Sequence, residues 1–227
     1  MKNFYDILSK VKYYPPISKK NPRIKKILSL INQLNISHQK ILDIGCYDGT
    51  LLSLIKPKNN KLYGIETNKY LISKCKNKNI LIKNFYVSDK NKLPFDNDFF
   101  TLVIAGEIIE HLFDPDHFTK ETRRVLANQG YLLISTPNIA SFPRRILLLF
   151  GFSPYIDISA FPYESSGHIK YFTFKTLEKI LKRNGFRILI KKSDTINFSK
   201  DGKYNSMLLA KLFPTLGQSV IFLAQKI

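Results

Sequence analysis

Hydrophobic residues fall along the chain in two alternating patterns, continuous short runs and runs repeated at helical spacing. Short apolar runs bounded by turn residues are typical of buried strands, whereas a period of three to four residues is typical of amphipathic helices. The continuous runs predict seven strands, at residues 40–45, 61–66, 79–85, 100–105, 130–135, 186–191 and 219–225. Because strands and helices alternate, we predict an α/β fold in which helices flank a mostly parallel sheet.

Polar capping residues locate the longer helices between these strands. The predicted caps are Asn21, Asp114 and Thr173, the first two each followed by proline. A polar side chain caps the free N–H groups of a helix, and proline fits the first helical position. Two further helices are expected, at residues 50–56 and 68–77.

The length of the chain fits one domain, so residues 1–227 are predicted to form a single unit. Residues 1–39 would form an irregular arm and the first helix. Residues 137–171 make a connection too long for an ordinary loop, which predicts a lid or binding insertion beside the ligand, or else an excursion on the sheet edge. Within it, residues 146–152 (ILLLFGF) would touch a lipid carrier or membrane surface, or pack as a helix on the core.

Composition adds a strong positive charge to this picture. Lys and Arg number 36 against 17 Asp and Glu, a net charge of +19, while 44% hydrophobic residues exclude global disorder. The charge favours polyanions such as RNA or anionic membrane surfaces, or reflects a lysine-rich composition alone. Two cysteines, no signal peptide and no integral membrane segment lead us to expect a soluble, cytoplasmic protein.

The turn after the first strand, in the stretch LDIGCYDGT, carries two glycines that allow a ligand to approach the backbone at a helix N-terminus. Tyr47 stands where the dinucleotide fingerprint has its second glycine, and no Lys-Ser or Lys-Thr follows, so neither that fingerprint nor a P-loop is present. Glu66 ends the second strand, where a carboxylate can accept both hydroxyls of a ribose.

From Ile41 to Phe186 the chain resembles the class I S-adenosylmethionine-dependent methyltransferases. The matching pieces, in order, are ILDIGCYDG, YGIE, VSDKNKLPFDNDFFTLVIAGEIIEHLFDP, RRVLANQGYLLISTPN and HIKYFTFKTLEKILKRNGF. This resemblance implies a Rossmann-like, doubly wound sheet of seven strands with the last strand antiparallel, and S-adenosylmethionine lying across the strand ends.

The resemblance also assigns residues to the cofactor. The residues that would bind it are Asp43, Gly45, Cys46, Tyr47, Gly49, Glu66, Ser88, Asp89 and Glu107. Among them, Glu66 would hold the ribose, and Asp89 would meet the adenine amino group. Tyr47 departs from the glycine that the family often has, so its ring either walls the pocket or weakens cofactor binding.

The acceptor site is expected in the segment GEIIEHL after the fourth strand. If this segment begins a helical turn, Glu107, Glu110 and His111 share one face. With His168 they would hold a divalent cation such as Mg or Mn, an arrangement that resembles small-RNA 3′-terminal ribose 2′-O-methyltransferases and the catechol O-methyltransferases of quinone biosynthesis. Without a metal, Glu110, His111 and His168 would serve as catalytic residues that contact or deprotonate the acceptor.

We therefore predict a methyltransferase that acts on a hydroxyl of a small molecule or glycan. A ribose O-methyltransferase acting on RNA ends is the nearest alternative, and a cofactor-binding module without catalysis is a third.

Overall fold

The computed structural model describes residues 17–55, 59–75, 78–154, 167–199 and 203–227. The predicted N-terminal arm lies mostly outside these residues. All seven predicted strands are present, with ends that differ by a few residues from the apolar runs: β1 (Lys40–Ile44), β2 (Lys61–Glu66), β3 (Ile80–Asn84), β4 (Phe100–Gly106), β5 (Leu126–Pro137), β6 (Phe186–Lys192) and β9 (Ser219–Lys226).

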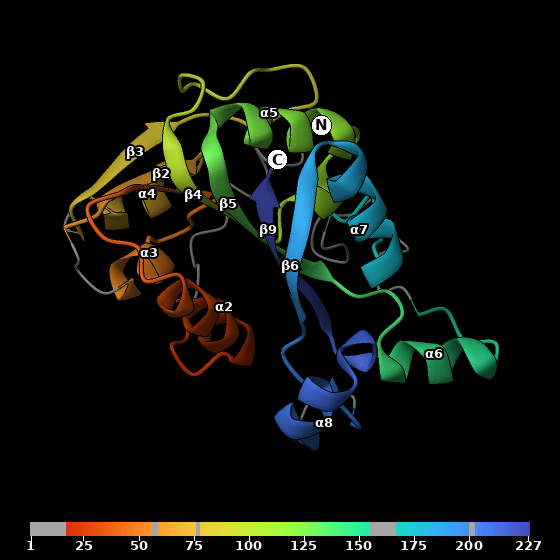
Figure 1. The fold of residues 1–227 in the computed structure, drawn as a ribbon. Helices are drawn as coiled ribbons and strands as arrows, with labels where there is room; N and C mark the ends of the chain where they lie inside the picture. The colour runs from red at the N-terminus through yellow and green to blue at the C-terminus, as the bar shows by residue number, and fades with distance from the viewer. Residues whose placement is uncertain (1–16, 56–58, 76–77, 155–166, 200–202) are drawn as a thin grey trace.

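The strands form one sheet in the order β3-β2-β1-β4-β5-β9-β6 (Figure 1). The last strand of the chain, β9, is antiparallel to its neighbours β5 and β6, while β1 to β5 pair in parallel. Both the α/β class and the antiparallel last strand are thus confirmed. In a sheet of this order the chain leaves β1 and β4 in opposite directions, which opens a crevice at their carboxyl ends.

Seven helices flank or extend the sheet in the described part of the chain: α2 (Pro22–Gln33), α3 (Thr50–Leu54), α4 (Lys69–Cys75), α5 (Pro115–Val125), α6 (Phe142–Leu149), α7 (Phe174–Arg183) and α8 (Met207–Leu212). Asn21 and Asp114 cap α2 and α5 as predicted, each with a side-chain oxygen that accepts two backbone N–H groups. Thr173 caps α7 in a reciprocal pair of hydrogen bonds with Thr176. Among the described residues, no helix is long and apolar enough to cross a membrane.

The central strands are buried on both faces, which explains why they are continuous apolar runs. In β4, Leu102 and Ile104 pack with α2 and α3 on one face. Val103 and Ala105 pack with α5 and α7 on the other face, so that the sheet is covered on both sides (Figure 1). Burial of alternate residues against opposite helical layers fixes the register of these strands.

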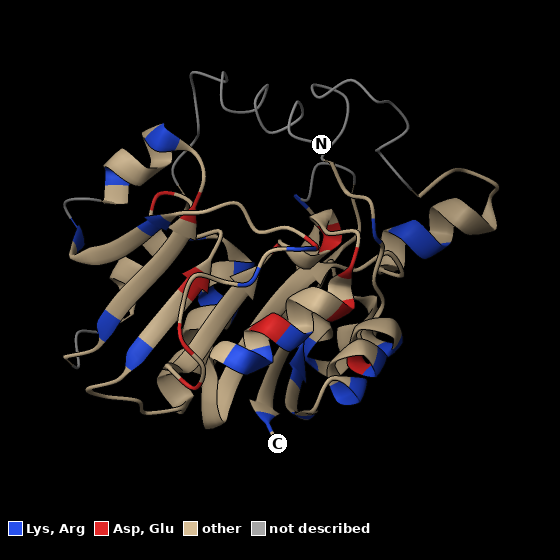
Figure 2. Ribbon diagram, turned by 90° about the horizontal axis from the view of Figure 1, so that it is seen from above, with Lys and Arg blue, Asp and Glu red and all other residues tan. Residues whose placement is uncertain are grey.

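Three features near the sheet's carboxyl edge were not predicted as such. A two-stranded pair, β7 (Ile196–Asn197) and β8 (Asn205–Ser206), precedes α8 and the short 3-10 turn η3 (Pro214–Leu216). Within the predicted lid, α6 buries none of its residues and projects at one side of the molecule (Figures 1 and 2). The core-packed alternative for residues 146–152 is therefore wrong, while residues 155–166 of the lid lie outside the described part.

Candidate active site

The carboxyl ends of β1, β2, β4 and β5 meet at one edge of the sheet, since these strands run in parallel. Most of the predicted site residues lie at this edge. Glu66 is the last residue of β2, Glu107 directly follows β4, and the turn with Gly45 and Gly49 follows β1.

The turn after β1 has left-handed backbone conformations at three residues. Gly45 and Gly49 each have a φ of 72°, and Tyr47 has a φ of 53°. The N–H groups of Gly45 and Cys46 donate to the carbonyl of Ile65 at 2.9 and 3.0 Å, which ties the turn to β2. Tyr47 thus adopts the left-handed conformation that the turn requires, although it is not glycine. The backbone strain at such a residue costs free energy of folding and is found mainly at functional sites.

Glu66 is held by backbone N–H groups of the turn after β1 and of the residues that directly follow β2. Its Oε2 accepts the N–H of Tyr47 at 3.1 Å, and its Oε1 accepts those of Thr67 and Asn68 at 2.8 and 3.0 Å. With about two lone pairs on each carboxylate oxygen, Oε1 is fully used and Oε2 can accept one further hydrogen bond. The carboxylate is therefore oriented in advance, and its Oε2 retains capacity to accept one ribose hydroxyl.

Asp43 and Cys46 lie beneath the turn, inside the protein. Asp43 is 3% exposed, and burial, followed by the charges of Glu66 and Cys75, raises its pKa to about 8. Cys46 is 1% exposed, and a hydrogen bond between the Cys46 and Cys75 thiols, with burial, raises the Cys46 pKa. Side chains this deep support the turn, so any contact of Cys46 with a cofactor would come from its backbone.

The residues predicted to meet the adenine lie on the connection from β3 to β4. Asp89 accepts the N–H of Asp114 at 2.8 Å through Oδ1. Ser88 accepts the N–H groups of Lys90 and Asn91 through its hydroxyl oxygen. Both side chains are half-buried. The Asp89 hydrogen bond joins the connection to the start of α5, whereas those of Ser88 stay within the connection.

Glu107 is separated from the other predicted acceptor residues. It follows β4 with a φ of 57°, accepts a hydrogen bond from the Ser135 hydroxyl, and forms an ion pair at 2.5 Å with Arg23 of α2. Sequence reasoning missed Arg23, because no local pattern links the first turn of α2 to a residue that distant in the chain.

Glu110, His111 and His168 come together as predicted. The first two lie on the 3-10 turn η2 (Ile109–His111), and the segment with His168 returns to it, because the N–H groups of Ile169 and Lys170 donate to the Glu110 carbonyl at 2.9 and 3.0 Å. The two imidazole rings lie 4.9 Å apart between centroids. One ligand atom from each of the three residues lies within 4.8 Å of the others.

The Glu110 carboxyl group is buried at 1% exposure, and only one of its oxygens is used. Its Oε2 accepts the hydroxyl of Thr136 at 2.9 Å. Its Oε1 lies 3.9 Å from His168 Nε2, and no described residue donates a hydrogen bond to it. Burial, together with the charge of Glu107, raises the Glu110 pKa to about 8.

His111 is oriented by the backbone. Its Nδ1 lies 3.0 Å from the Gly167 carbonyl oxygen, which can only accept, so Nδ1 carries the proton. In the neutral ring Nε2 is then a hydrogen-bond acceptor or a metal ligand. The three side chains can therefore bind a hydroxyl proton, or supply two nitrogens and a carboxylate oxygen to a divalent cation.

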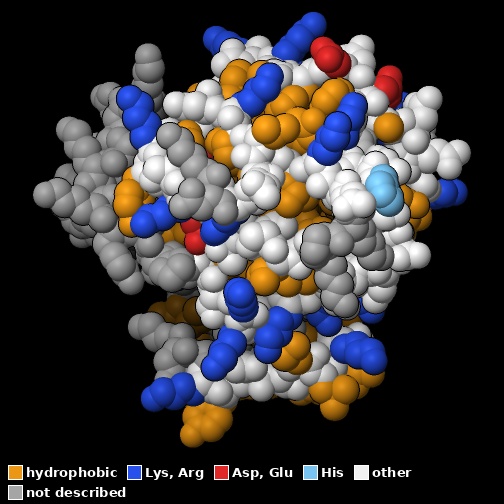
Figure 3. All heavy atoms as spheres, turned by 90° about the vertical axis from the view of Figure 1, so that its left-hand side faces the viewer, with side chains coloured by type: hydrophobic (Ala, Val, Ile, Leu, Met, Phe, Trp, Pro, Cys, Tyr) orange, Lys and Arg blue, Asp and Glu red, His pale blue; other side chains and the backbone are white. Residues whose placement is uncertain are grey.

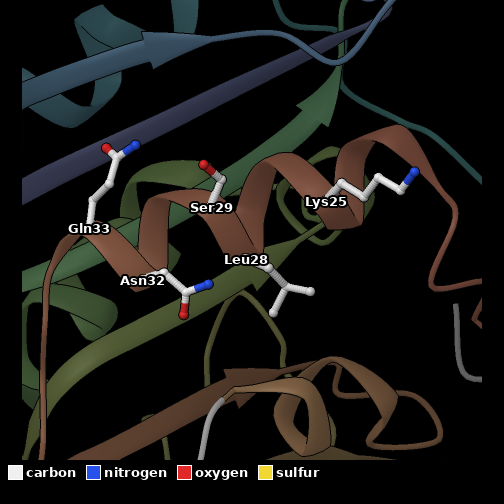
Figure 4. Close-up of a pocket in the computed structure, with 5 residues that line it drawn as sticks. All are labelled: Lys25, Leu28, Ser29, Asn32 and Gln33. Atoms are coloured by element: carbon white, nitrogen blue, oxygen red, sulfur yellow. The ribbon is translucent and has the colours of Figure 1, made fainter.

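A separate hollow of about 540 Å³ lies along the outer face of α2 (Figure 4). Five side chains of this one helix line it: Lys25, Leu28, Ser29, Asn32 and Gln33. It contains no carboxylate or imidazole and none of the predicted site residues.

Comparison with known proteins shows the family to which the chain belongs. Residues 16–190 match the model of a methyltransferase domain. A demethylmenaquinone methyltransferase of Thermotoga maritima is 22% identical, with 81% of this chain and 83% of the relative covered. A ubiquinone biosynthesis O-methyltransferase of Bartonella bacilliformis is 28% identical, with 76% and 72% covered.

Solved structures share the fold at low identity. The N-methyltransferase NodS of Bradyrhizobium japonicum, in complex with S-adenosyl-L-homocysteine, is 14% identical over 99% of this chain and 98% of its own, with a TM-score of 0.63. Because the family model spans most of the chain, the protein belongs to the methyltransferase domain family and is a class I S-adenosylmethionine-dependent methyltransferase.

Proposed function

We propose that the chain transfers the methyl group of S-adenosylmethionine to a hydroxyl oxygen of a small molecule or glycan, and that Glu110, His111 and His168 contact this acceptor. The observation that carries the proposal is the buried Oε1 of Glu110, which faces His168 without a hydrogen bond from any described residue. A buried polar atom without a partner is costly, so a ligand that supplies one is favoured there.

The chemistry of the transfer fits these residues. The sulfonium supplies an activated methyl group, so the protein must align the acceptor oxygen and take up its proton. His111 offers Nε2 as a proton acceptor, because its Nδ1 donates to the Gly167 carbonyl. An oxygen acceptor is further supported by relatives named as O-methyltransferases of ubiquinone biosynthesis.

A second candidate is the same transfer assisted by a divalent cation. The three ligand atoms within 4.8 Å of one another favour it, as does the carbonyl that orients His111, a common feature of metal-bound histidines. Glu110, His111 and His168 would hold the ion, which would lower the pKa of a bound hydroxyl group. Glu107 is not part of this set, because its carboxylate pairs with Arg23.

Single substitutions test the proposal. We expect His111→Ala, His168→Ala and Glu110→Gln each to lower turnover about 10²- to 10⁴-fold, the usual contribution of a positioned acid or base. Binding of S-adenosylhomocysteine, measured by calorimetry, should remain, since these residues lie apart from Glu66. Turnover is followed as S-adenosylhomocysteine release with catechols, sugars and amines as acceptors.

His117→Ala is the matched control, because His117 contacts the Asn91 carbonyl outside the cluster. Wild-type turnover in all three variants, or turnover with amines alone, would contradict the proposal. Loss of activity with a chelator and its return with Mg²⁺ or Mn²⁺ would select the metal-assisted form.

A further inference from the structure

Large hydrophobic side chains are exposed on α6, at Phe198 and Tyr204 beside the β7–β8 pair, and on α8 with the residue that follows it. Within α6 and α8, the most exposed aliphatic side chains are Leu149 at 76%, Leu208 at 66%, Leu148 at 64% and Leu212 at 61%. Phe150 and Phe213 are exposed at 70% and 55%. We call the exposed hydrophobic residues of α6, residues 150–152, α8 and Phe213, together with Phe198 and Tyr204, the apolar surface.

The segments that carry the apolar surface are far apart in the sequence but contact one another. The rings of Phe142 in α6 and Phe198 after β7 lie 5.6 Å apart between centroids. Arg145 of α6 donates to the carbonyl of Thr215 in η3 at 3.3 Å. Both α6 and α8 also contact β7.

This surface lies at the same edge of the sheet as the candidate active site. The chain enters α6 directly after the carboxyl end of β5, and β7 follows the carboxyl end of β6. Figure 1 places α6 and α8 beyond this end of the sheet, and Figure 3 shows hydrophobic side chains protruding at the height of α8.

An apolar face of this kind needs a covering partner. Helices of six and eight residues are too short to be stable in water by themselves, and contiguous exposed apolar patches usually mark interaction sites. Neither helix is long enough to span a bilayer, so membrane contact would take the form of insertion at the level of the lipid headgroups.

The charge of the apolar surface selects the partner. Residues 142–154, 195–199 and 203–217 contain Arg144, Arg145, Lys203 and Lys211 and no Asp or Glu. The intervening residues 200–202 add one Lys and one Asp, which cancel. A second copy of a chain with a net charge of +19 would be repelled, whereas anionic headgroups would attract this cationic surface.

We propose that the apolar surface docks on an anionic lipid bilayer, with leucine and phenylalanine side chains entering the headgroup region and Lys211 and its basic neighbours facing the phosphates. The docking is independent of the acceptor chemistry proposed above and is tested without turnover.

Flotation of the full chain with vesicles tests the docking. We expect it to float with vesicles that contain phosphatidylglycerol and phosphatidylcholine, less with phosphatidylcholine alone, and less as salt is raised. The double variant Leu148→Ser with Leu149→Ser should bind at least about tenfold more weakly, because two apolar side chains no longer enter the bilayer. Lys211→Glu should weaken binding to the anionic vesicles only.

Leu81→Ser and Lys61→Glu are the matched controls. Leu81 is 59% exposed on β3, the outermost strand on the side of the sheet away from β9 and β6. Lys61 begins β2, at the end of the strands opposite to their carboxyl ends. Thermal stabilisation by S-adenosylhomocysteine shows that each variant is folded. The proposal is wrong if the wild type fails to float with anionic vesicles, if the double leucine variant floats as the wild type does, or if the protein is a dimer in solution that this variant converts to a monomer.

Discussion

Two buried carboxyl groups, those of Asp43 and Glu110, hold protons to an unusually high pH. Burial is the main cause in both, followed by the charge of Glu66 for Asp43 and of Glu107 for Glu110, and each pKa is raised to about 8. In the unfolded chain both groups would titrate near pH 4. The folded state therefore binds more protons than the unfolded state between about pH 4 and 8.

This difference predicts a loss of stability at alkaline pH. An acid whose pKa is raised by folding contributes stability that is complete below its unfolded pKa and disappears as the pH rises through its folded pKa. We expect the free energy of unfolding to fall by a few kcal/mol between about pH 5 and 9, as measured by urea denaturation. Asp43→Asn and Glu110→Gln should each remove part of this slope.

Glu178→Gln is the control variant: it removes a carboxylate whose pKa is not raised by folding. Ion pairs with Lys182 and Lys191 lower the Glu178 pKa, so its contribution has the opposite sign and is lost in acid. This variant should keep the wild-type alkaline slope. An identical slope in the wild type, Asp43→Asn and Glu110→Gln would show that neither carboxyl is protonated at neutral pH.

Part of the candidate site could be predicted from the residue types and their spacing in the sequence. The grouping of Glu110, His111 and His168 followed from helical spacing and from a resemblance that placed His168 near the cluster. Thr136, which donates to Glu110, and Arg23, which pairs with Glu107, were not predicted. Their roles depend on packing between elements distant in sequence, and a Thr at a strand end or an Arg in a first turn has no local signature.

At the scale of elements, the turn between β1 and α3 depends on glycine for two separate reasons. Gly49 has a φ of 72°, and a Cβ there would lie 2.7 Å from Ile80 Cδ1 and 3.1 Å from Cys75 Sγ. Gly151, after α6, has a φ of 77°, but no heavy atom lies within 4 Å of its Cβ position. Both positions therefore require a left-handed backbone conformation, but only Gly49 is closely packed against other side chains.

Alanine at these positions separates the two effects. We expect Gly151→Ala to lose about 1–2 kcal/mol from the left-handed backbone alone. Gly49→Ala should lose about 1–3 kcal/mol more, because the core must shift to admit the methyl group. Its affinity for S-adenosylhomocysteine should also fall, unlike that of Gly151→Ala. Equal losses of unfolding free energy in the two variants would contradict the packing argument.

Elements with several apolar residues or a polar cap were the ones that the sequence predicted well. Each strand of the main sheet is an apolar run, and the caps at Asn21, Asp114 and Thr173 begin helices where expected. The β7–β8 pair was not predicted because each of its strands has only two residues. The helix α8 was not predicted because it buries only Ala210. Elements this short carry no hydrophobic period, so their conformation depends on tertiary contacts.

On the scale of the whole molecule, positive charge is spread over the surface as well as gathered near α6 and α8. Lys and Arg side chains are scattered over the face seen in Figure 3, and Asp and Glu are few on it. A dispersed field attracts any polyanion through counterion release and distinguishes poorly among polyanions. The charge alone thus supports association with nucleic acid without recognition of a ribose.

This predicts that single-stranded RNA and DNA of the same sequence bind with the same affinity. In fluorescence anisotropy, both affinities should fall together as salt rises, with a log–log slope of about −0.7 per phosphate contact. A protein that methylates the 2′-hydroxyl of RNA ends would behave differently, because only RNA presents that hydroxyl to the site. A preference for RNA that persists at high salt, and that Glu110→Gln or His168→Ala abolishes, would therefore replace the small-molecule or glycan acceptor with an RNA end. Equal binding, unaffected by these two substitutions, would assign the nucleic-acid affinity to the dispersed lysines and leave the cluster to a smaller acceptor.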